Sequence, residues 1–449
     1  MPKTIISVDP KKAPWEQETP LHNRWHPDIP PVASVKEGEA FRVECVDWTG
    51  GQIKNDDSSD DVKNVDLSQV HYLSGPIEIE GAKAGDLLKV EFLNLGPLDG
   101  DEWGFTGTFA KENGGGFLTD HFPKATKACW DIEGIWCTSR HIPGVKFAGL
   151  IHPGLIGTAP SHELLEMWNE RESALVAEEG TEAEKPYVDA SILGHWLAYR
   201  SPKEPCWASL DTFLISIRRL DEAWDAIASK AARTVPGREN GGNCDIKNLS
   251  RGCTVYFPVF VDGAMLSMGD MHMSQGDGEV SFCGAIEMSG FLELKCTVIK
   301  GGMKLLPVVG PSPLSVNPIF EIGPLEPRYS EWLVFEGVSV DEQGRQHYLD
   351  ATIAYKRAVL NCIKYLSQFG YSEEQVYLLL SCCPCEGRIS GIVDVPNAVA
   401  TLAVPLAIFD RDVRPPADLE HFAQGIKTVS RDVCISEEGG AVPYDPRLG

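Results

Sequence analysis

The chain has 449 residues and a mass of 49.2 kDa, and its 40 Lys and Arg residues against 65 Asp and Glu residues give a formal net charge of −25. A charge of this sign repels phosphate backbones and anionic membrane surfaces, so neither nucleic acid nor membrane is expected as a partner. The chain has no apolar run long enough for a membrane span or a signal core, and its crowded Cys382, Cys383 and Cys385 are unlike paired disulfides, so we expect a cytoplasmic protein.

Short β-strands dominate the first part of the chain. Apolar and polar residues alternate over 40–46, 75–79 and 86–92, which is the pattern of half-buried strands. The sequence between the first two strands, at 54–61, is polar and acidic and predicts a solvated loop unless something cationic holds it. We therefore expect residues 1–161 to form the β-rich N-terminal part of the core.

The pattern changes character at residue 162. Apolar residues among many glutamates indicate a surface helix over 162–180, and a second helix is expected over 221–233. Residues 162–234 are therefore predicted to be a helical insertion. Strand patterns return over 254–261 and 291–298, so residues 235–310 are predicted to be a β segment that carries the active site.

The last part of the chain combines both kinds of element. Helical spacing over 351–369 stops at Gly370, and another helix is expected over 372–381. We expect an α/β C-terminal part over 311–410 and an extended acidic tail over 411–449. Because strands and helices do not alternate along the chain, the predicted class is mainly β or α+β, a β-sandwich core with a helical insertion and an α/β C-terminal region.

The densest chemistry lies at 269–279. Asp270 and His272 are two residues apart, so on an extended segment their side chains leave the same face and can converge on one cation. Gly276 and Gly278 allow a tight turn that brings Glu279 back toward that point, where a carboxylate can act as a base. The alternative is an ordinary hairpin in which His272 is a satisfied core residue.

A second cluster lies at 237–245. Asn243 and Asp245 have the same two-residue offset, and Gly241 and Gly242 allow the backbone to approach a ligand closely. The alternative reading of this cluster is an Asn-Gly turn. Asp56, in the acidic loop after Gln52, is a third candidate ligand, and its alternative reading is a solvated charge.

Two further candidates carry weaker signals. His152, before Pro153 and Gly154, is a candidate for the lining of a pocket, although a histidine at a turn is more often structural. Cys385 beside Glu386 is a candidate nucleophile, although a cysteine after an apolar helix is usually buried and inert.

Several of these segments together resemble the acetamidase/formamidase family. The resemblance is carried by Gly-Gly-Asn-x-Asp at 241–245, Gly-Asp-x-His-x-x-x-Gly-Asp-Gly-Glu at 269–279, Gly-Thr-Ala-Pro at 157–160 and Cys-Gly-Ala-Ile-Glu at 283–287, and it covers most of residues 7–410. The insertion and the extended C-terminal region are similar to the longer formamidase branch. This resemblance implies release of ammonia and a carboxylic acid from short amides, bound zinc or calcium, and assembly from identical chains.

The residues and the resemblance together give one hypothesis. Asp245, Asp270 and His272 hold a divalent metal, most simply zinc and alternatively calcium, with Asp56 or Glu287 completing the shell. Glu279 is the general base for hydrolysis of formamide or another short amide. The remaining predicted roles are catalytic for Asn243 and His152, and substrate-binding for Gly241, Gly242 and Gln52.

Two rival functions stay open at this point. One is a cysteine-dependent amidase that uses Cys385, and the other is a non-catalytic β-sandwich protein whose acidic loops hold structural calcium. Sensitivity to a chelator separates the first rival from a metal-dependent enzyme, and release of ammonia separates the second.

Overall fold

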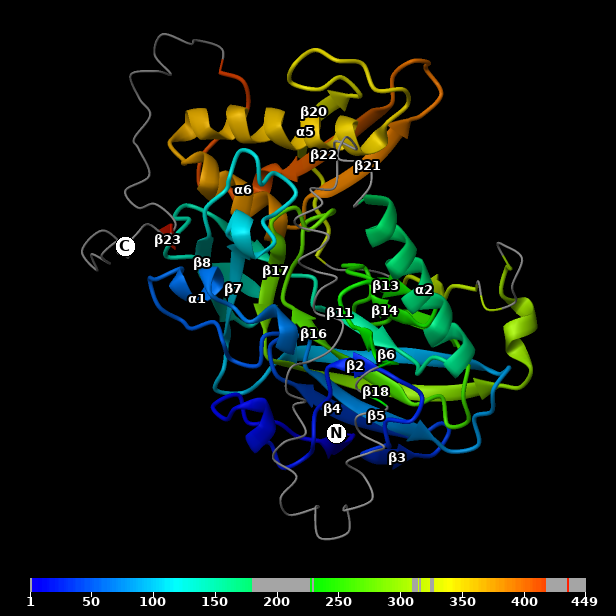
Figure 1. Cartoon of the computed structure of the whole chain (residues 1–449). Helices are drawn as coiled ribbons and strands as arrows, with labels where there is room; N and C mark the ends of the chain where they lie inside the picture. Colours follow the sequence, from blue (N-terminus) through cyan, green and yellow to red (C-terminus); the bar gives the residue numbers. More distant parts are fainter. Residues whose placement is uncertain are drawn as a thin grey trace.

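Two large β-sheets form the body of the protein in a computed structural model (Figure 1). The structure describes residues 2–179, 227, 230–308, 314, 316–323, 327–416 and 434–435. The first sheet has six strands in the order β1-β4-β18-β6-β15-β19. Their bounds are Lys3–Ile6 for β1, Ala40–Cys45 for β4, Leu87–Pro97 for β6, Thr254–Pro258 for β15, Gly290–Ile299 for β18 and Ile319–Glu321 for β19.

The second sheet has twelve strands and contains the predicted active-site segments. Its main path is β10-β9-β8-β7-β17-β16-β11-β14-β13, and β3, β5 and β23 pair at its side. The bounds are β3 (Ala33–Val35), β5 (Leu73–Ile79), β7 (Trp103–Thr108), β8 (Thr126–Glu133), β9 (Trp136–Thr138), β10 (Lys146–Ala148), β11 (His152–Gly157), β13 (Gly237–Arg238), β14 (Gly241–Asn243), β16 (Leu266–His272), β17 (Phe282–Met288) and β23 (Cys434–Ile435).

The hydrophobic core lies between these two sheets. Strand β4 buries Phe41, Val43 and Cys45 and leaves the residues between them half-buried, as period-two alternation requires. These side chains share one apolar cluster with Met268 of β16 and Ile156 of β11. Strand β16 is buried along its whole length because β11, β17 and β5 pair with it. The predicted mainly β fold with a sandwich core is confirmed.

The helical insertion is described only in part. Helix α2 (His162–Glu179) begins where the sequence predicts and buries Leu164, Leu165 and Trp168. Most of the second predicted helix, over 221–233, lies outside the described residues. Its last two positions form strand β12 (Ala232–Arg233), which pairs with β2 (Arg24–Trp25), so the helix prediction is wrong there. The backbone hydrogen bonds to β2 outweigh the local helical pattern.

A separate layer is built by the C-terminal part of the chain (Figure 1). Helix α5 (Ala351–Leu366) covers a three-stranded sheet of β20 (Trp332–Val338), β22 (Val399–Pro405) and β21 (Glu386–Gly391). Asp350 caps the start of α5, and the chain leaves the helix through Gly370 at φ 96°. Helix α6 (Glu373–Cys382) follows and contacts β17, β7 and β8. The predicted α/β C-terminal region is confirmed.

The remaining elements are short. They are α1 (Asp60–Lys63) and the 3-10 turns η1 (Pro14–Glu16), η2 (Leu67–Gln69), η3 (Lys111–Asn113), η6 (Gly302–Leu305), η7 (Ser367–Phe369) and η8 (Leu406–Ile408). Within the described ranges, no helix combines the length and apolar character that crossing a membrane requires. Residues 417–433 and 436–449 of the predicted acidic tail lie outside the described residues, and the domain boundaries stay predictions.

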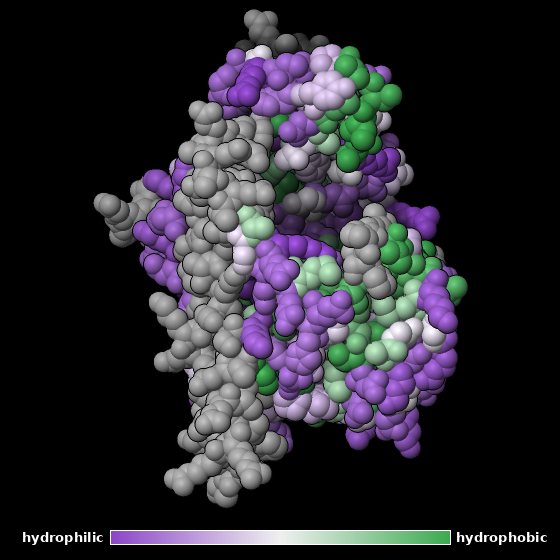
Figure 2. Space-filling model, turned by 45° about the vertical axis from the view of Figure 1, so that its right-hand side comes forward, coloured by the Kyte–Doolittle hydropathy of each residue, from purple (hydrophilic) through white to green (hydrophobic). Residues whose placement is uncertain are grey.

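Apolar side chains are exposed on the C-terminal layer. Figure 2 shows hydrophobic residues gathered at the upper end of the molecule, while much of the remaining coloured surface is hydrophilic. In the β21–β22 hairpin, Ile389, Ile392, Val393 and Val395 have between 55% and 75% of their surface exposed. Exposed apolar patches of this kind often mark contact surfaces.

Candidate active site

The end of strand β16 and the neighbouring strand β17 bring three ligand-type side chains together. His272 and Glu287 are direct partners in the β16–β17 ladder, and Asp270 lies two residues before His272. His272 Nε2 is 3.2 Å from Asp270 Oδ1 and 3.0 Å from Glu287 Oε2. All three residues are almost completely buried. One ligand atom from each lies within 4.8 Å of the others, a spacing that permits a shared metal ion.

A second group shares the same histidine. Asp245, which follows β14, and Glu279, in the loop between β16 and β17, each place a carboxylate oxygen within 4.8 Å of a ring nitrogen of His272. The backbone N–H of Gly284 donates to Glu279 Oε1 at 3.2 Å. The segments around residues 245 and 270–279 therefore meet at one centre, as the hypothesis requires.

The backbone is strained at three of these acidic residues. Asp245, Asp270 and Glu279 have φ angles of 48°, 56° and 43°, in the left-handed region that side chains other than glycine rarely adopt. Such conformations cost on the order of 1–3 kcal/mol each and are concentrated at functional sites, where the surrounding structure holds them in place. The strain therefore points to function independently of the residue types.

The carboxyl groups repel one another in their ionised forms. Burial and neighbouring carboxylates raise the pKa of Asp245 and of Glu287 to about 7, and they raise the pKa of Glu279 well above its ordinary value. Although burial opposes its charged form, the carboxylates of Glu287 and Asp270 hold the pKa of His272 well above the usual range. One imidazole thus faces four carboxyl groups, of which those of Asp270 and Glu287 belong to fully buried residues.

This charge imbalance fits a divalent cation. Asp245 Oδ1 is sealed from water and has no hydrogen-bond partner among the described residues, so it lacks the compensation that a buried carboxylate oxygen needs. Carboxylate oxygens and an imidazole nitrogen are a ligand set that zinc and related divalent ions accept. The residues present therefore fit the predicted metal, while metal binding itself stays a prediction.

His152 lies behind this centre. It pairs with His272 across the β11–β16 ladder, and its Nε2 is 3.2 Å from His272 Nδ1. Both rings contact the side-chain oxygen of Gln275, at 2.9 Å from His152 Nε2 and 3.0 Å from His272 Nδ1. Since His152 contacts the side of His272 that faces away from the carboxylates, we assign it to positioning that ring, in place of the predicted catalytic role.

A small cavity opens beside the carboxylates. The volume available to the centre of a water molecule is about 50 Å³. The polar side chains of its wall are those of His71, Asn243, Asp270, Glu279 and Glu287. Of these, only His71 was not predicted from the sequence. The apolar part of the wall consists of Trp48, Val70, Phe109, Val235 and Phe282.

Gly241 and Gly242 of the predicted site both have left-handed backbone conformations, and at Gly241 a side chain does not fit. Gly241 and Gly242 lie in β14 between β11 and β13, with φ angles of 105° and 68°. A β-carbon on Gly241 would lie 2.5 Å from the carbonyl oxygen of Ile156. They shape the turn into Asn243, but neither lines the cavity.

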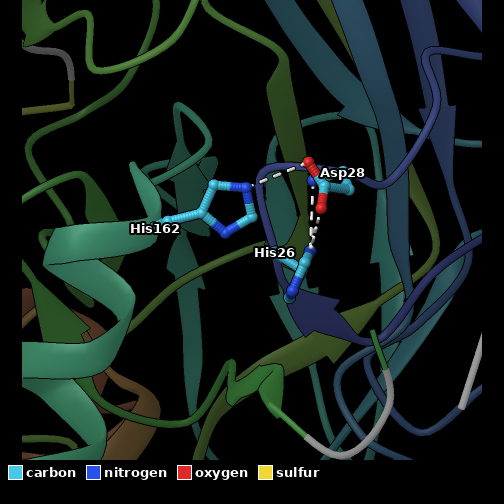
Figure 3. A group of neighbouring side chains, drawn as sticks. All are labelled: His26, Asp28 and His162. Atoms are coloured by element: carbon cyan, nitrogen blue, oxygen red, sulfur yellow. Dashed lines mark hydrogen bonds and ion pairs between the residues drawn. The ribbon is translucent and has the colours of Figure 1, made fainter. Parts of the chain in front are cut away.

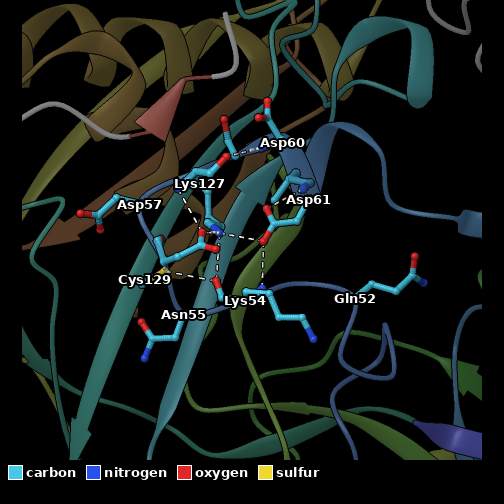
Figure 4. A network of polar contacts seen from close by, with 12 residues as sticks. Gln52, Lys54, Asn55, Asp57, Asp60, Asp61, Lys127 and Cys129 are labelled. Atoms are coloured by element: carbon cyan, nitrogen blue, oxygen red, sulfur yellow. Dashed lines mark hydrogen bonds and ion pairs between the residues drawn. The ribbon is translucent and has the colours of Figure 1, made fainter. Parts of the chain in front are cut away.

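The structure does not bring Asp56 or Gln52 to this cavity. Asp56 binds the buried ammonium group of Lys127 at 2.8 Å. Asp61 binds the same ammonium group (Figure 4). Gln52 hydrogen-bonds backbone atoms of Thr49 and Asp66 within its own loop. Lys127 thus holds the acidic loop, together with Arg140, which binds Asp57 at 2.9 Å. Glu287, the predicted alternative to Asp56, takes the place at the centre.

Another histidine-containing group lies apart from the cavity. His26, Asp28 and His162 bring ligand-type atoms within 4.8 Å of one another (Figure 3). His26 Nδ1 already accepts the backbone N–H of Asp28 at 3.1 Å, and the side chains of Asp28 and His162 are 56% and 63% exposed. This group joins the start of α2 to the segment after β2 and does not contribute to the cavity.

Cys385 is placed unfavourably for a nucleophile. Its side chain is completely buried, and its thiol donates to the backbone oxygen of Leu380 at 3.0 Å. Burial also raises the pKa of the neighbouring thiols of Cys382 and Cys383 well above the ordinary value. A reactive cysteine requires access to its substrate, and the buried thiol of Cys385 has none.

Comparison with known proteins places the chain in a family. The family model for the acetamidase/formamidase family matches residues 7–411. The chain belongs to this family. A formamidase from Methylophilus methylotrophus is 53% identical over 416 residues, which is 93% of this chain and 96% of the relative. An acetamidase from Mycolicibacterium smegmatis is 52% identical over 399 residues, 86% of this chain and 91% of the relative.

A solved structure extends the comparison to the fold of the family. The γ-lactamase from Delftia acidovorans is 49% identical to this chain and superposes on it with a TM-score of 0.85. The superposition covers 97% of this chain and 100% of the γ-lactamase chain. The family predicted from the motifs is therefore confirmed. The relatives of this family member are named after two linear amides, formamide and acetamide, and after a lactam.

Proposed function

We propose that the protein hydrolyses formamide, or another short primary amide, to ammonia and the carboxylic acid. The observation that carries the proposal is the convergence of four carboxyl groups on His272, in two groups formed by Asp270 with Glu287 and by Asp245 with Glu279. Three of these carboxyl side chains, Asp270, Glu279 and Glu287, line one small cavity. Relatives named formamidase and acetamidase, each more than half identical to this chain, support the same reaction class.

The cavity favours a very small substrate. A volume of about 50 Å³ for the centre of a water molecule compares with roughly 10–15 Å³ needed by one water, so a molecule of a few heavy atoms fits. Trp48, Phe109 and Phe282 form rigid aromatic walls. Formamide has only a carbon, an oxygen and a nitrogen, and the additional methyl group of acetamide is worth roughly 1–3 kcal/mol in a tight pocket.

The residues that would hold a divalent ion are Asp245, Asp270 and His272, with Glu287 completing the shell. Such an ion, for which zinc is our first proposal and calcium the alternative, would supply a Lewis acid able to polarise the amide oxygen and to lower the pKa of water. Gln275 fixes the ring of His272 from behind, which keeps Nε2 directed at the carboxylates.

Glu279 is the proposed base. It lines the cavity beside the ligand residues, and its raised pKa makes its carboxylate a better proton acceptor than an ordinary glutamate. Glu279 takes a proton from the attacking water as the oxygen bonds to the amide carbon. It returns that proton to the nitrogen as the carbon–nitrogen bond breaks, and ammonia leaves.

The test is the release of ammonia by the purified protein from formamide, acetamide and propionamide. We expect turnover to fall in that order, because each added carbon must fit against the aromatic walls. Failure to release ammonia from any of the three amides would remove the proposed function.

Three finer proposals accompany this one. The net charge and the cysteine usage support a cytoplasmic location. The exposed apolar hairpin at 389–395 supports assembly from identical chains. A role in releasing nitrogen from short amides follows from the reaction itself.

A further inference from the structure

The loop that carries Glu279 is held by helix α6. It connects β16 to β17, and α6 lies beside β17 (Figure 1). The backbone N–H of Gly276 donates to the backbone oxygen of Ser381 at 2.8 Å. The backbone N–H of Ser281 donates to the hydroxyl oxygen of Ser381 at 3.0 Å. One residue of α6 therefore binds the loop on both sides of Glu279.

Asp277, two residues before Glu279, ties the loop to the C-terminal layer at three points. Its backbone N–H donates to the backbone oxygen of Cys385 at 3.2 Å, and its side-chain Oδ2 accepts the N–H of Gly387 at 2.9 Å. Its own backbone oxygen accepts the hydroxyl of Tyr355 at 2.5 Å. These partners belong to the turn after α6, to β21 and to α5. The C-terminal layer therefore fixes both the backbone and the side chain of Asp277.

The other oxygen of the Asp277 carboxylate leads back to the segment of Asp245. Lys247 lies two residues after Asp245, and its Nζ is 2.9 Å from Asp277 Oδ1. The same ammonium group donates to the backbone oxygen of Cys385. The side chain of Lys247 is only 9% exposed, so its charge needs these two partners. We propose that Asp277, through this ion pair, is the residue that positions Glu279 relative to Asp245.

Glu279 and Asp245 both need to be held by other parts of the chain. Their backbones have φ angles of 43° and 48°, which side chains other than glycine rarely adopt. Their carboxylate oxygens lie within 4.8 Å of each other and of a ring nitrogen of His272, and ionised carboxylates at this distance repel. Strain favours a different backbone at each residue, and repulsion favours their separation. The ion pair between Asp277 and Lys247 opposes both, because it joins the two segments.

The positioning by Asp277 depends on its charge. A carboxylate has only acceptor oxygens, and here one accepts the Gly387 N–H while the other faces the ammonium group of Lys247. An asparagine that kept the first contact would turn its NH₂ group toward Lys247, so that two donors would face each other. Asp277→Asn therefore breaks the ion pair at nearly constant volume. This inference rests on the proposed function of Glu279 as the base and adds the residue that positions it.

The first test is the turnover of formamide by Asp277→Asn. We expect kcat to fall by about 10- to 100-fold with KM within about threefold, because misplacing a catalytic group by about 1 Å can cost a factor of about 100. Rates are expressed per bound metal, so that loss of metal does not imitate this effect. Asp277→Glu keeps the charge and should recover part of the loss. A kcat of Asp277→Asn within about threefold of the wild type would overturn the positioning role.

A second test separates positioning of the base from general support of the fold. In Glu279→Gln no base is left to position, so adding Asp277→Asn to that variant should lower the residual kcat by less than about twofold. A residue that only supports the fold would lower kcat by the same factor with and without the base. Equal factors in the two backgrounds would therefore overturn the proposal.

The partner lysine is tested in the same way. Lys247→Met keeps the length of the side chain and removes its charge, so kcat should fall by a factor similar to that of Asp277→Asn. The double variant Lys247→Met/Asp277→Asn should be about as active as either single variant, because both changes break the same ion pair. Losses that multiply in the double variant would show that the two residues act separately and would overturn the pairing.

Asp86 provides a matched control away from the cavity. Like Asp277, it binds a lysine, Lys300 Nζ at 3.0 Å, and accepts a backbone N–H, that of Gly301 at 2.8 Å, and it does not line the cavity. Asp86→Asn should lower the melting temperature and leave kcat within about twofold of the wild type. A loss of kcat as large as that of Asp277→Asn would show that kcat follows general stability, and it would overturn the proposal.

Hydrogen exchange measures the tie without any substrate. Amide exchange followed by mass spectrometry should be faster over residues 276–281 in Asp277→Asn than in the wild type, with strand β4 unchanged. Unchanged exchange in the loop would overturn the proposal. Absence of ammonia release by the wild type from every amide would instead remove the proposed function, and the exchange measurement would still decide whether Asp277 holds the loop.

Discussion

Gly154 of β11 lies against Asp270 of β16 so closely that a β-carbon on Gly154 would come within 2.5 Å of Asp270 Oδ2. The same atom would lie 2.5 Å from His272 Cε1 and 2.8 Å from Asp245 Oδ1. A glycine at this position therefore makes room for the three proposed ligands at once.

Gly154→Ala should weaken metal binding. The added methyl group has no free space, so it must push Asp270 or His272 away from the common centre. We expect loss of most of the bound metal in dialysed protein, with the rest of the fold retained by circular dichroism. Gly391→Ala is the matched control, because its β-carbon would meet nothing closer than Asp394 Oδ2 at 3.6 Å. Equal metal content in both variants would contradict the placement of the ligands.

Glu279→Gln should separate catalysis from binding. The amide keeps the size of the side chain but cannot accept a proton from water, so kcat should fall by about 100- to 10,000-fold. The metal content should stay close to that of the wild type, since Asp245, Asp270, His272 and Glu287 remain. Glu166→Gln, at an exposed position of α2, is the control and should leave kcat unchanged. Near-normal turnover of Glu279→Gln would remove Glu279 from the role of base.

Lys127→Met should destabilise the acidic loop. Lys127 is fully buried, and its ammonium group donates to Asp56, Asp61 and the backbone oxygen of Lys54. Breaking a buried ion pair costs about 3–5 kcal/mol, and the partial exposure of the two carboxylates reduces the expected loss to about 1–3 kcal/mol. Urea unfolding measures this loss in the free energy of unfolding. Lys36→Met, at an exposed position, is the control and should lower the free energy of unfolding by less than about 0.5 kcal/mol.

The same ion pair has a defined pH dependence. Burial opposes ionisation of Asp56, but the hydrogen bonds from Lys127 and from the backbone of Ser58, together with the charge of Lys127, lower the pKa of Asp56. A carboxyl group with a lower pKa in the folded protein stabilises the fold above its unfolded pKa of about 4. That contribution is lost as the pH falls through the folded pKa. The stability difference between wild type and Lys127→Met should therefore shrink in acid, and a difference that grows below pH 4 would contradict the pairing.

Cys385 should be dispensable for turnover. Iodoacetamide should leave the activity of the native protein unchanged, because the thiol is buried and hydrogen-bonded to Leu380. Unfolded protein should be alkylated at Cys385, which shows that the reagent is effective. Cys385→Ala should retain kcat within a few fold. Complete loss of turnover in a Cys385→Ala protein with full metal content would support the thiol mechanism instead.

Local patterns predicted the strands and part of the centre. The alternation of apolar and polar residues correctly predicted strands β4 and β18, because one face of each strand packs on the core. The two-residue spacing of Asp270 and His272 also predicted their proximity, because residues two apart on an extended strand point to the same face. The glycines at 276 and 278 similarly predicted the turn that returns Glu279 to the centre.

The remaining features depend on contacts between distant parts of the chain. His71, which lies two residues before strand β5, lines the cavity because β5 pairs with β16. The residues around His71 show no local pattern that predicts this pairing. Asp56 is held by Lys127, which is 71 residues away along the chain. His152 lies behind His272 because the β11–β16 register opposes the two rings. Long-range pairing of this kind is not encoded in local spacing.

The most direct measurement of the central claim is the metal content and the formamide turnover of one purified sample, determined together. The account predicts a divalent metal in stoichiometric amount, joint loss of metal and ammonia release with a strong chelator, and joint recovery when zinc is added back. Asp270→Asn should lower both. A metal-free sample that releases ammonia from formamide at the full rate would contradict the account.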